Sequence, residues 1–141
     1  MFELKIVRER RQGYGTLRMV RSAQDVYETF RARFERADRE EFLAVLLDGR
    51  NQVTGFNVVS TGTLTASLVH PREVFKPAIL GNAAALILLH NHPSGDPEPS
   101  AEDKALTERL RQAGDLIGIR ILDHVVIGDQ RFVSFADRGL F

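Results

Sequence analysis

An uninterrupted apolar run at residues 83–89 is the feature that most limits what this chain can fold into. Its apolar side chains do not alternate with polar ones, which is typical of a strand covered on both faces. Helical patterns lie on either side of it in the sequence, at 22–34 and 101–116. We therefore predict an α/β fold of the mixed α+β kind, in which a mixed β-sheet packs against helices.

The other elements follow from local patterns. Ser22, with Asp25 three residues later, predicts a capped helix whose Val26, Phe30 and Phe34 share one apolar face. A helix should start at Pro71 and run to about Gly81, and Pro77 should kink or shorten it. The remaining expectations are a short strand at 3–8, a loop at 11–21, a hairpin of 41–48 with 52–60, and a hairpin of 120–127 with 131–135.

The segment after the apolar run gathers side chains that can bind a metal or move protons. His90 and His92 are two residues apart, so an extended strand points both imidazoles the same way. The prolines and glycine that follow exclude helix and ladder and force a rigid loop. Ser100 can then cap a helix, which places Asp103 in its first turn, facing back toward the histidines.

This set of side chains indicates a catalytic zinc site. Two neutral imidazoles and one carboxylate leave the fourth tetrahedral position for water, whereas thiolates usually close structural zinc sites. The chain has no cysteine. A structural explanation stays open beside this one, because Ser100 and Asp103 have the spacing of a capping box, with Asp in place of Glu or Gln. Capping does not exclude catalysis, and it does not explain the histidine pair.

The pattern His90-x-His92-Pro93, six residues, Ser100, two residues and Asp103 resembles the JAMM (MPN-type) metalloprotease motif. The complete sequence of residues 90–97 resembles the RadC branch of that family. The same is true of Gly62-Thr63-Leu64, residues 69–75 and Leu122-Asp123-His124. The resemblance runs from about residue 22 to residue 134. It implies a curved mixed sheet between helices, the JAMM/MPN (cytidine-deaminase-like) architecture, and Zn²⁺ held by His90, His92 and Asp103.

The resemblance also implies a catalytic glutamate that lies far earlier in the chain, just before a hydrophobic strand. The pattern Asp38-Arg39-Glu40-x-Phe42 makes Glu40 the candidate base. Relatives often have His at the next position, where this chain has Glu41. Because successive strand residues face opposite ways, only one of the two carboxylates can address the zinc, and we expect Glu41 to be a solvated charge. Glu73 is a third candidate, but after Pro71 it can simply complement a helix dipole.

A mechanism follows from these assignments. Zinc lowers the pKa of its bound water toward about 7, Glu40 would act as general base and then general acid, and Ser100 could donate a hydrogen bond to the oxyanion. JAMM relatives cleave peptide or isopeptide bonds, so the resemblance implies amide hydrolysis of a peptide or protein substrate, whose identity does not follow.

Three further residues have both a functional and a structural interpretation. One of Asp123 and His124 could orient a zinc-ligating imidazole, or the two could be satisfied locally in their strand. Asp96, in the loop, has the same two interpretations.

Length and composition limit the remaining possibilities. At 141 residues the chain is one domain of ordinary size, with an N-terminal extension at 1–21 and the RadC-like domain at 22–141. The absence of cysteine excludes disulfides. The start lacks the apolar core of a signal peptide and no apolar run approaches the ~20 residues of a membrane span, so we expect a cytoplasmic protein without membrane contact.

Two alternative functions stay open. With 19 basic and 19 acidic residues the chain has no global field that would attract nucleic acid, and the arginine-rich stretch of Arg8, Arg10, Arg11, Arg18 and Arg21 is more simply a solvated segment. RadC proteins nevertheless carry a DNA-repair name, and many have a helix-hairpin-helix DNA-binding domain. The roughly twenty residues before Ser22 leave no room for such a domain, so we expect only a weak association with nucleic acid. The other alternative is a scaffold that has lost its ligands, which the complete ligand set argues against. The oligomeric state is not indicated.

Overall fold

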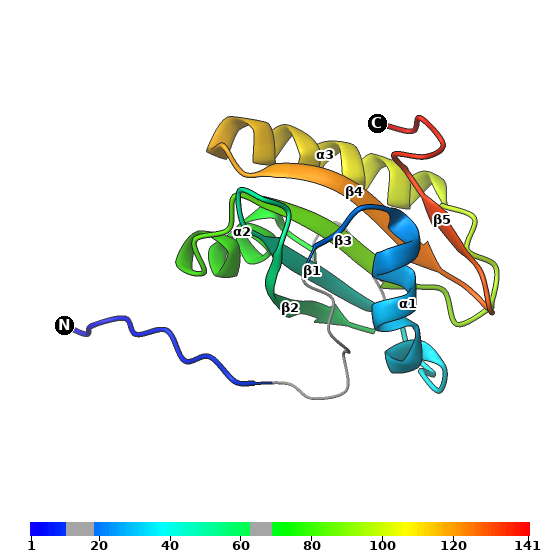
Figure 1. Cartoon of the computed structure of the whole chain (residues 1–141), viewed down its shortest axis with the longest axis horizontal. Helices are drawn as coiled ribbons and strands as arrows, with labels where there is room; N and C mark the ends of the chain where they lie inside the picture. Colours follow the sequence, from blue (N-terminus) through cyan, green and yellow to red (C-terminus); the bar gives the residue numbers. More distant parts are fainter. Residues whose placement is uncertain (11–18, 63–68) are drawn as a thin grey trace.

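The computed structural model describes residues 1–10, 19–62 and 69–141. Three helices and five strands form within these ranges, and all belong to one mixed α/β arrangement (Figure 1). In chain order they are α1 (Ala23–Phe34), β1 (Glu41–Leu47), β2 (Val53–Thr61), α2 (Pro71–Leu80), β3 (Ala85–Asn91), α3 (Ala101–Ile117), β4 (Arg120–Ile127) and β5 (Phe132–Ser134).

The five strands form one open sheet in the order β2-β1-β3-β4-β5. β3 runs parallel to β4, and the other neighbouring pairs are antiparallel. β3 is the central strand and all seven of its residues are buried, which confirms the interpretation of the apolar run. Both predicted hairpins are present, as β1 with β2 and β4 with β5.

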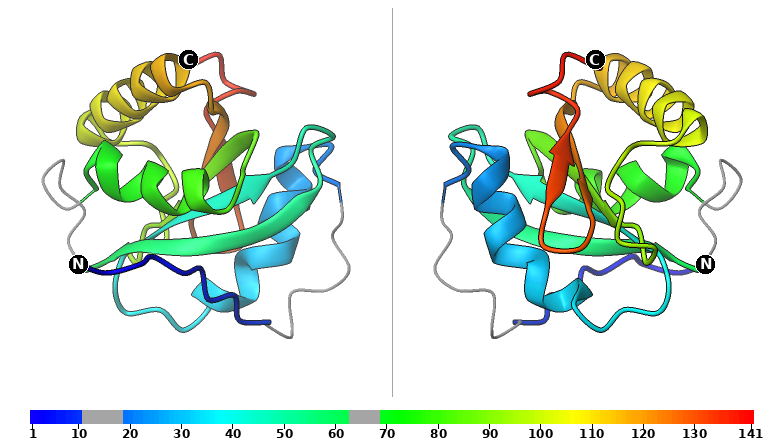
Figure 2. Two further views of the ribbon diagram at one scale, coloured as in Figure 1. Left: turned by 90° about the vertical axis from the view of Figure 1, so that its left-hand side faces the viewer. Right: turned by 90° about the vertical axis from the view of Figure 1, so that its right-hand side faces the viewer.

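Helices cover both faces of the sheet, with α1 on one face and α2 and α3 on the other (Figure 2). Alternate residues of β3 supply the two cores: Ile87 and Leu89 pack on the α1 side, and Leu86 and Leu88 on the side of α2 and α3. The predicted mixed sheet packed between helices is confirmed. The same alternation continues to the end of the strand, so His90 falls on the α3 side and Asn91 on the α1 side.

The N-terminal segment differs from the prediction. Residues 1–10 contain no strand, and Phe2 and Leu4 are largely exposed. Alternating apolar and polar side chains favour an extended chain, but a strand also requires the edge of another strand to bond with, and this segment has not paired with one. Residues 11–18, most of the predicted loop, lie outside the described residues; Met19 bridges to Gln52 beside the start of β2.

Pro77 does not shorten α2, because the helix continues to Leu80, close to the predicted end at about Gly81. The kink expected at Pro77 stays a prediction. A proline removes one N–H donor, yet the following turn stays bonded: the Gly81 N–H donates to the Pro77 carbonyl at 2.8 Å. Ala78, next to the proline, is fully buried against the sheet, so tertiary packing holds this part of the helix in place.

Candidate metal centre

Three side chains meet where β3 ends and α3 begins. Nε2 of His90 and Nε2 of His92 are 3.0 Å apart, and Oδ2 of Asp103 is 3.1 Å from the latter. Oδ1 of Asp103 is 3.4 Å from Nε2 of His90. Among the residues that the structure describes, this is the only group of three or more histidines or carboxylates whose ligand atoms gather so closely.

Local structure positions each member of the group. His90 belongs to β3, and His92 lies one residue beyond Asn91, where its N–H bonds to the Ile127 carbonyl of β4 at 2.9 Å. The pair therefore converges although only His90 is in the strand. Asp103 is held by the predicted capping box: its N–H donates to Ser100 Oγ at 3.0 Å, and the Ser100 N–H donates to its Oδ2 at 2.8 Å.

The donor atoms fit a metal ion. Nδ1 of His92 is 2.7 Å from the Asp96 carbonyl oxygen, which can only accept, so Nδ1 carries the proton and Nε2 presents a lone pair to the group. Two imidazole lone pairs and a carboxylate that face one another repel unless a cation lies between them. Tetrahedral zinc with bonds of 2.0–2.1 Å holds its ligand atoms about 3.3–3.4 Å apart, close to the separations found here.

Electrostatics at the group favour a bound cation. Burial of Asp103 disfavours its charged form, but the neighbouring His90 and His92 rings and the hydrogen bond from the Ser100 N–H outweigh burial and hold the pKa of this carboxyl well below its usual range. The hydrogen bond to Asp103 raises the pKa of His92, and the Asp96 carbonyl adds to this while burial opposes it. A proton can thus occupy the position between these side chains, and a metal ion would release it.

The two adjacent glutamates face different partners. β1 and β3 are antiparallel with Phe42 opposite His90, so Glu40, two residues before Phe42, lies toward the end of β3 from which His92 follows. The charge of Glu40 contributes to the raised pKa of His92, which places the two side chains in electrostatic range. Glu41 instead forms an ion pair with Arg33 of α1 at 2.9 Å. It is half-buried, so the expectation of a merely solvated charge at this position was wrong.

Sequence reasoning missed Asn91, which lies between the two histidines. Its Oδ1 accepts the Glu41 N–H at 2.7 Å, and its Nδ2 donates to the Arg39 carbonyl at 3.0 Å. An amide can donate and accept at once, so this side chain clamps the backbone on both sides of Glu40. The only signal in the sequence was its place in the motif, because its partners are about fifty residues away.

The contacts of Asp123, His124 and Asp96 decide between the functional and the structural interpretation of each residue. His124 contacts the centre, with its Nε2 2.7 Å from Nδ1 of His90, and burial lowers the pKa of its ring well below the usual value. The carboxylate of Asp123 instead accepts hydrogen bonds from its own strand and from β5 and the turn after it, at the His124 N–H, Ser134 Oγ and the Ala136 N–H. Asp96 contacts His92 through its main-chain carbonyl, and its carboxylate accepts the Glu98 N–H.

The remaining candidates lie away from the centre. Glu73 is in the first turn of α2, partly exposed, and the Lys76 ammonium 2.8 Å away lowers its pKa. Of the basic stretch, Arg8, Arg10 and Arg21 are exposed, and Arg11 and Arg18 lie outside the described residues. Thr63 and Leu64 of the Gly62-Thr63-Leu64 motif also lie outside them.

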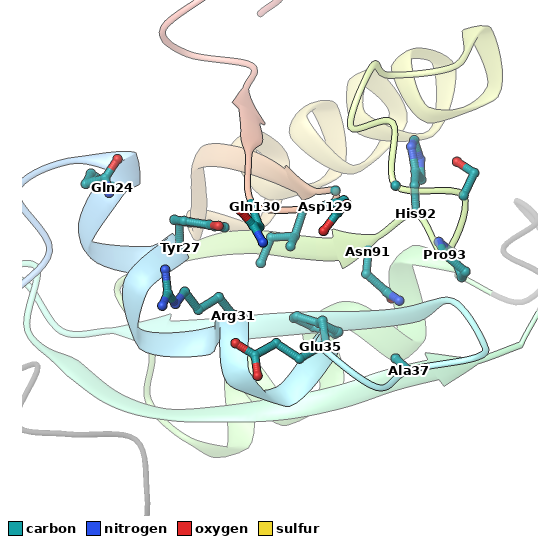
Figure 3. A pocket seen from close by; sticks show the side chains of 15 residues that line it. Gln24, Tyr27, Arg31, Glu35, Ala37, Asn91, His92, Pro93, Asp129 and Gln130 are labelled. Carbon is teal, nitrogen blue, oxygen red and sulfur yellow. The ribbon is translucent and has the colours of Figure 1, made fainter.

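A groove of about 870 Å³ borders this centre at His92 (Figure 3). Tyr27 and Arg31 of α1 line one end, and Asn91, His92 and Pro93 line the other. The turn between β4 and β5 borders it between these ends, with Asp129 and Gln130. His92 is the one candidate ligand that also lines the groove, so the groove adjoins the metal centre at this side chain. None of the helices within the described ranges is long and apolar enough to cross a membrane.

Comparison with known proteins agrees with this geometry. The family model described as the RadC-like JAB domain matches residues 20–140. A UPF0758 protein of Geobacter sulfurreducens is 54% identical over 119 residues, which are 84% of this chain and 52% of the relative. UPF0758 proteins of Desulforamulus reducens and Methanosarcina acetivorans are 52% and 51% identical, each over 86% of this chain and 54% and 53% of their own lengths. The chain thus spans about half the length of these relatives, and it belongs to the RadC-like JAB domain family.

Proposed function

We propose that this domain is a zinc-dependent metallohydrolase of the JAMM type that cleaves peptide or isopeptide bonds. The observation that carries the proposal is the convergence of two imidazole nitrogens and a carboxylate within 3.0–3.4 Å, in electrostatic range of Glu40. Such a ligand set is typical of catalytic zinc and leaves one coordination position for the reaction.

His90, His92 and Asp103 would hold the zinc ion. When bound, zinc supplies a Lewis acid that brings the pKa of a water toward about 7 and polarises the substrate carbonyl. The protein's own residues do the remaining work. The Asp96 carbonyl and the Ser100 capping box fix the orientation of His92 and Asp103 before any metal enters, which reduces the reorganisation on binding.

Glu40 is the general base in this proposal. It would take a proton from the attacking water and return it to the leaving nitrogen, as general acid. Two observations support Glu40 over its neighbour: the charge of Glu40 contributes to the raised pKa of His92, and Glu41 forms an ion pair with Arg33. The clamp by Asn91 on both sides of Glu40 supplies the positional control that proton transfer requires.

Ser100 would stabilise the oxyanion. Its cap uses a lone pair on Oγ to accept the Asp103 N–H, so the hydroxyl proton is still able to point toward the substrate. A donor that meets charge only as it develops in the transition state contributes to turnover without strengthening ground-state binding.

A polypeptide is the substrate class that the groove supports. It is large, it continues from His92 to α1, and it presents both signs of charge, with Arg31 on α1, Glu35 just after α1 and Asp129 opposite them. Extended peptides offer alternating amides and side chains that can use such a mixed lining. Association with DNA has less support, because it rests on the exposed arginines near the N-terminus; salt-dependent binding to a duplex would favour it.

The test combines metal analysis with turnover. Purified wild type should carry one zinc per chain by elemental analysis, and His92→Ala should lose most of it while staying folded. A panel of peptide and isopeptide substrates should then be cleaved by the wild type. Glu40→Gln should keep zinc and lose turnover by roughly a hundredfold or more, the scale of a general base.

Glu41→Gln is the matched control and should change turnover little. Equal zinc in wild type and His92→Ala would refute the ligand assignment. If Glu41→Gln were the inactive variant, the catalytic role would belong to Glu41, and activity in both variants would remove these carboxylates from the mechanism.

A further inference from the structure

Behind His90, on the side away from the cluster of ligand atoms, two polar side chains are enclosed by the core. Thr107 of α3 is 1% exposed and His124 of β4 is 0% exposed. The ring of Phe135 stacks on His124 with 4.7 Å between centroids, and Phe42 meets it edge-on. Solvent water cannot form hydrogen bonds with these buried polar groups, so the hydrogen bonds within the protein decide where each proton resides.

The direction of these bonds is fixed at the helix end. Thr107 Oγ is 2.6 Å from the main-chain carbonyl oxygen of Asp103, and a carbonyl can only accept, so the single hydroxyl proton is donated there. Nδ1 of His124 is also 2.6 Å from Thr107 Oγ. The hydroxyl has no second proton to donate, and therefore Nδ1 of His124 must carry the proton of this contact.

The tautomer of His124 then determines the tautomer of His90. A fully buried imidazole between aromatic rings is neutral because a charge there would be strongly disfavoured. With its one proton on Nδ1, His124 can only accept at Nε2. That atom is 2.7 Å from Nδ1 of His90, so His90 is protonated at Nδ1 and its Nε2 carries a lone pair toward His92 and Asp103.

We propose that Thr107 and His124 are positioning residues that hold His90 in the one tautomer able to bind a metal, through a one-way chain of hydrogen bonds that starts at the Asp103 carbonyl. This inference rests on the proposed metal site. This series of hydrogen bonds begins and ends at the same residue, because the Asp103 main-chain carbonyl accepts its first bond and the Asp103 carboxylate is a proposed metal ligand.

If these hydrogen bonds ran in the opposite direction, a proton would occupy the proposed metal site. If His124 carried its proton on Nε2, it would donate to Nδ1 of His90, and the proton of His90 would move to Nε2. That proton would then point at Nε2 of His92, 3.0 Å away, in the position of the metal. Thr107 opposes this state because its oxygen offers His124 Nδ1 an acceptor and no donor.

The test compares Thr107→Val, which keeps the shape of the side chain and removes the hydroxyl, with Thr107→Ser, which retains it. Zinc affinity is measured by competition with a chromophoric chelator. We expect Thr107→Val to bind zinc roughly 10–100-fold more weakly, the usual effect of removing a partner of a metal-ligating histidine. Thr107→Ser should stay near the wild-type value.

Thr29→Val is the matched control. Thr29 Oγ donates to the Asp25 carbonyl four residues earlier at 2.7 Å, the same helical bond that Thr107 makes, but in α1 and outside the His90–His124 chain. Its removal should leave zinc affinity unchanged. Wild-type affinity in a folded Thr107→Val protein would overturn the proposal.

A second readout does not depend on the metal. In the zinc-free wild type, ¹⁵N NMR of the histidine rings should show His90 and His124 both protonated at Nδ1, and Thr107→Val should raise the population protonated at Nε2. His90 protonated at Nε2 in the wild type would overturn the proposal even if Thr107→Val fails to fold. Absence of zinc binding by a wild type with the expected tautomers would instead contradict the proposed function and leave the hydrogen-bond chain standing.

Discussion

Ser100 combines a structural bond with a proposed chemical one, and substitutions can separate them. The cap bond of 3.0 Å to the Asp103 N–H predicts that Ser100→Ala lowers the free energy of unfolding by about 1 kcal/mol. As an oxyanion donor it also predicts a loss of turnover of roughly 10²–10³-fold. Ser100→Asp should keep the cap and the zinc and be inactive, because its carboxylate would repel the developing negative charge.

Ser22→Ala is the control for the Ser100 variants, since Ser22 is the N-cap of α1 but makes no side-chain cap bond, and the Asp25 N–H donates to its main-chain carbonyl at 3.2 Å. It should lose less stability than Ser100→Ala, measured by urea denaturation, and retain turnover. An active Ser100→Asp enzyme would leave Ser100 with its structural role alone.

Substitution of Asn91 should lower turnover without removing zinc, unlike substitution of a metal ligand. Asn91→Ala removes both bonds that clamp the backbone beside Glu40, so we expect turnover to fall by roughly 10–10²-fold, as small displacements of catalytic groups do. Zinc stoichiometry should stay at one per chain. The decisive measurement is a double-mutant cycle: in a Glu40→Gln background, Asn91→Ala should reduce turnover little further. A full additive loss would show that Asn91 does not act through Glu40.

At the scale of elements, the loop 93–99 and the turn between β4 and β5 are packed as one unit. The Asp129 N–H donates to the Gly95 carbonyl at 2.8 Å, and the Gly128 Cα lies so close to the loop that an added Cβ would be 2.3 Å from that same oxygen. The loop carries the Asp96 carbonyl that fixes the His92 ring. The hairpin turn therefore sets the distance of the loop from the sheet.

Gly128→Ala should displace this loop. We expect a loss of about 1–3 kcal/mol in the free energy of unfolding from overpacking, and zinc binding weakened by roughly tenfold or more because the support of His92 shifts. Gly49→Ala, in the turn between β1 and β2, is the control, because a Cβ there would meet nothing within 4 Å. Chelator competition and thermal unfolding of the two variants provide the comparison; equal zinc affinity would show that the loop adjusts without moving His92.

At the scale of the whole molecule, the metal centre lies at one end of a sheet that already has a core on each face. Of the residues that the structure describes, fourteen buried ones form the core beneath α2 and α3, and thirteen form the core beneath α1. Neither core includes His90, His92 or Asp103. The apolar packing that holds the helices to the sheet therefore does not depend on a bound ion.

Removal of zinc should leave the fold intact. We expect far-ultraviolet circular dichroism to be unchanged after chelation, and the melting temperature to fall by an amount that tracks the free zinc concentration. Binding to the native state alone adds about 2.7 kcal/mol of stability when zinc is at a hundred times its dissociation constant. Loss of secondary structure on chelation would mean that the ion is structural, as in small zinc domains.

Much of the fold could be predicted because its signals are local. The apolar run at 83–89 specified a strand buried on both faces, and the spacing of Ser100 and Asp103 specified the cap that begins α3. The same spacing indicated the three candidate ligands, since a strand end and a first helical turn are short and regular. The prediction failed where a strand needed a partner: a short strand was expected at residues 3–8, and no strand forms there.

The sequence by itself determined the periodicity of each element, the helix caps and the ligand motif, because these depend on residues a few positions apart. Only the tertiary structure decided the partners of the motif. Asn91 meets the backbone beside Glu40 because β1 lies antiparallel to β3, and His124 reaches His90 because β4 lies parallel to it. Strand order and register are set by how both faces of the sheet are covered, a property of the packed chain that no local spacing specifies.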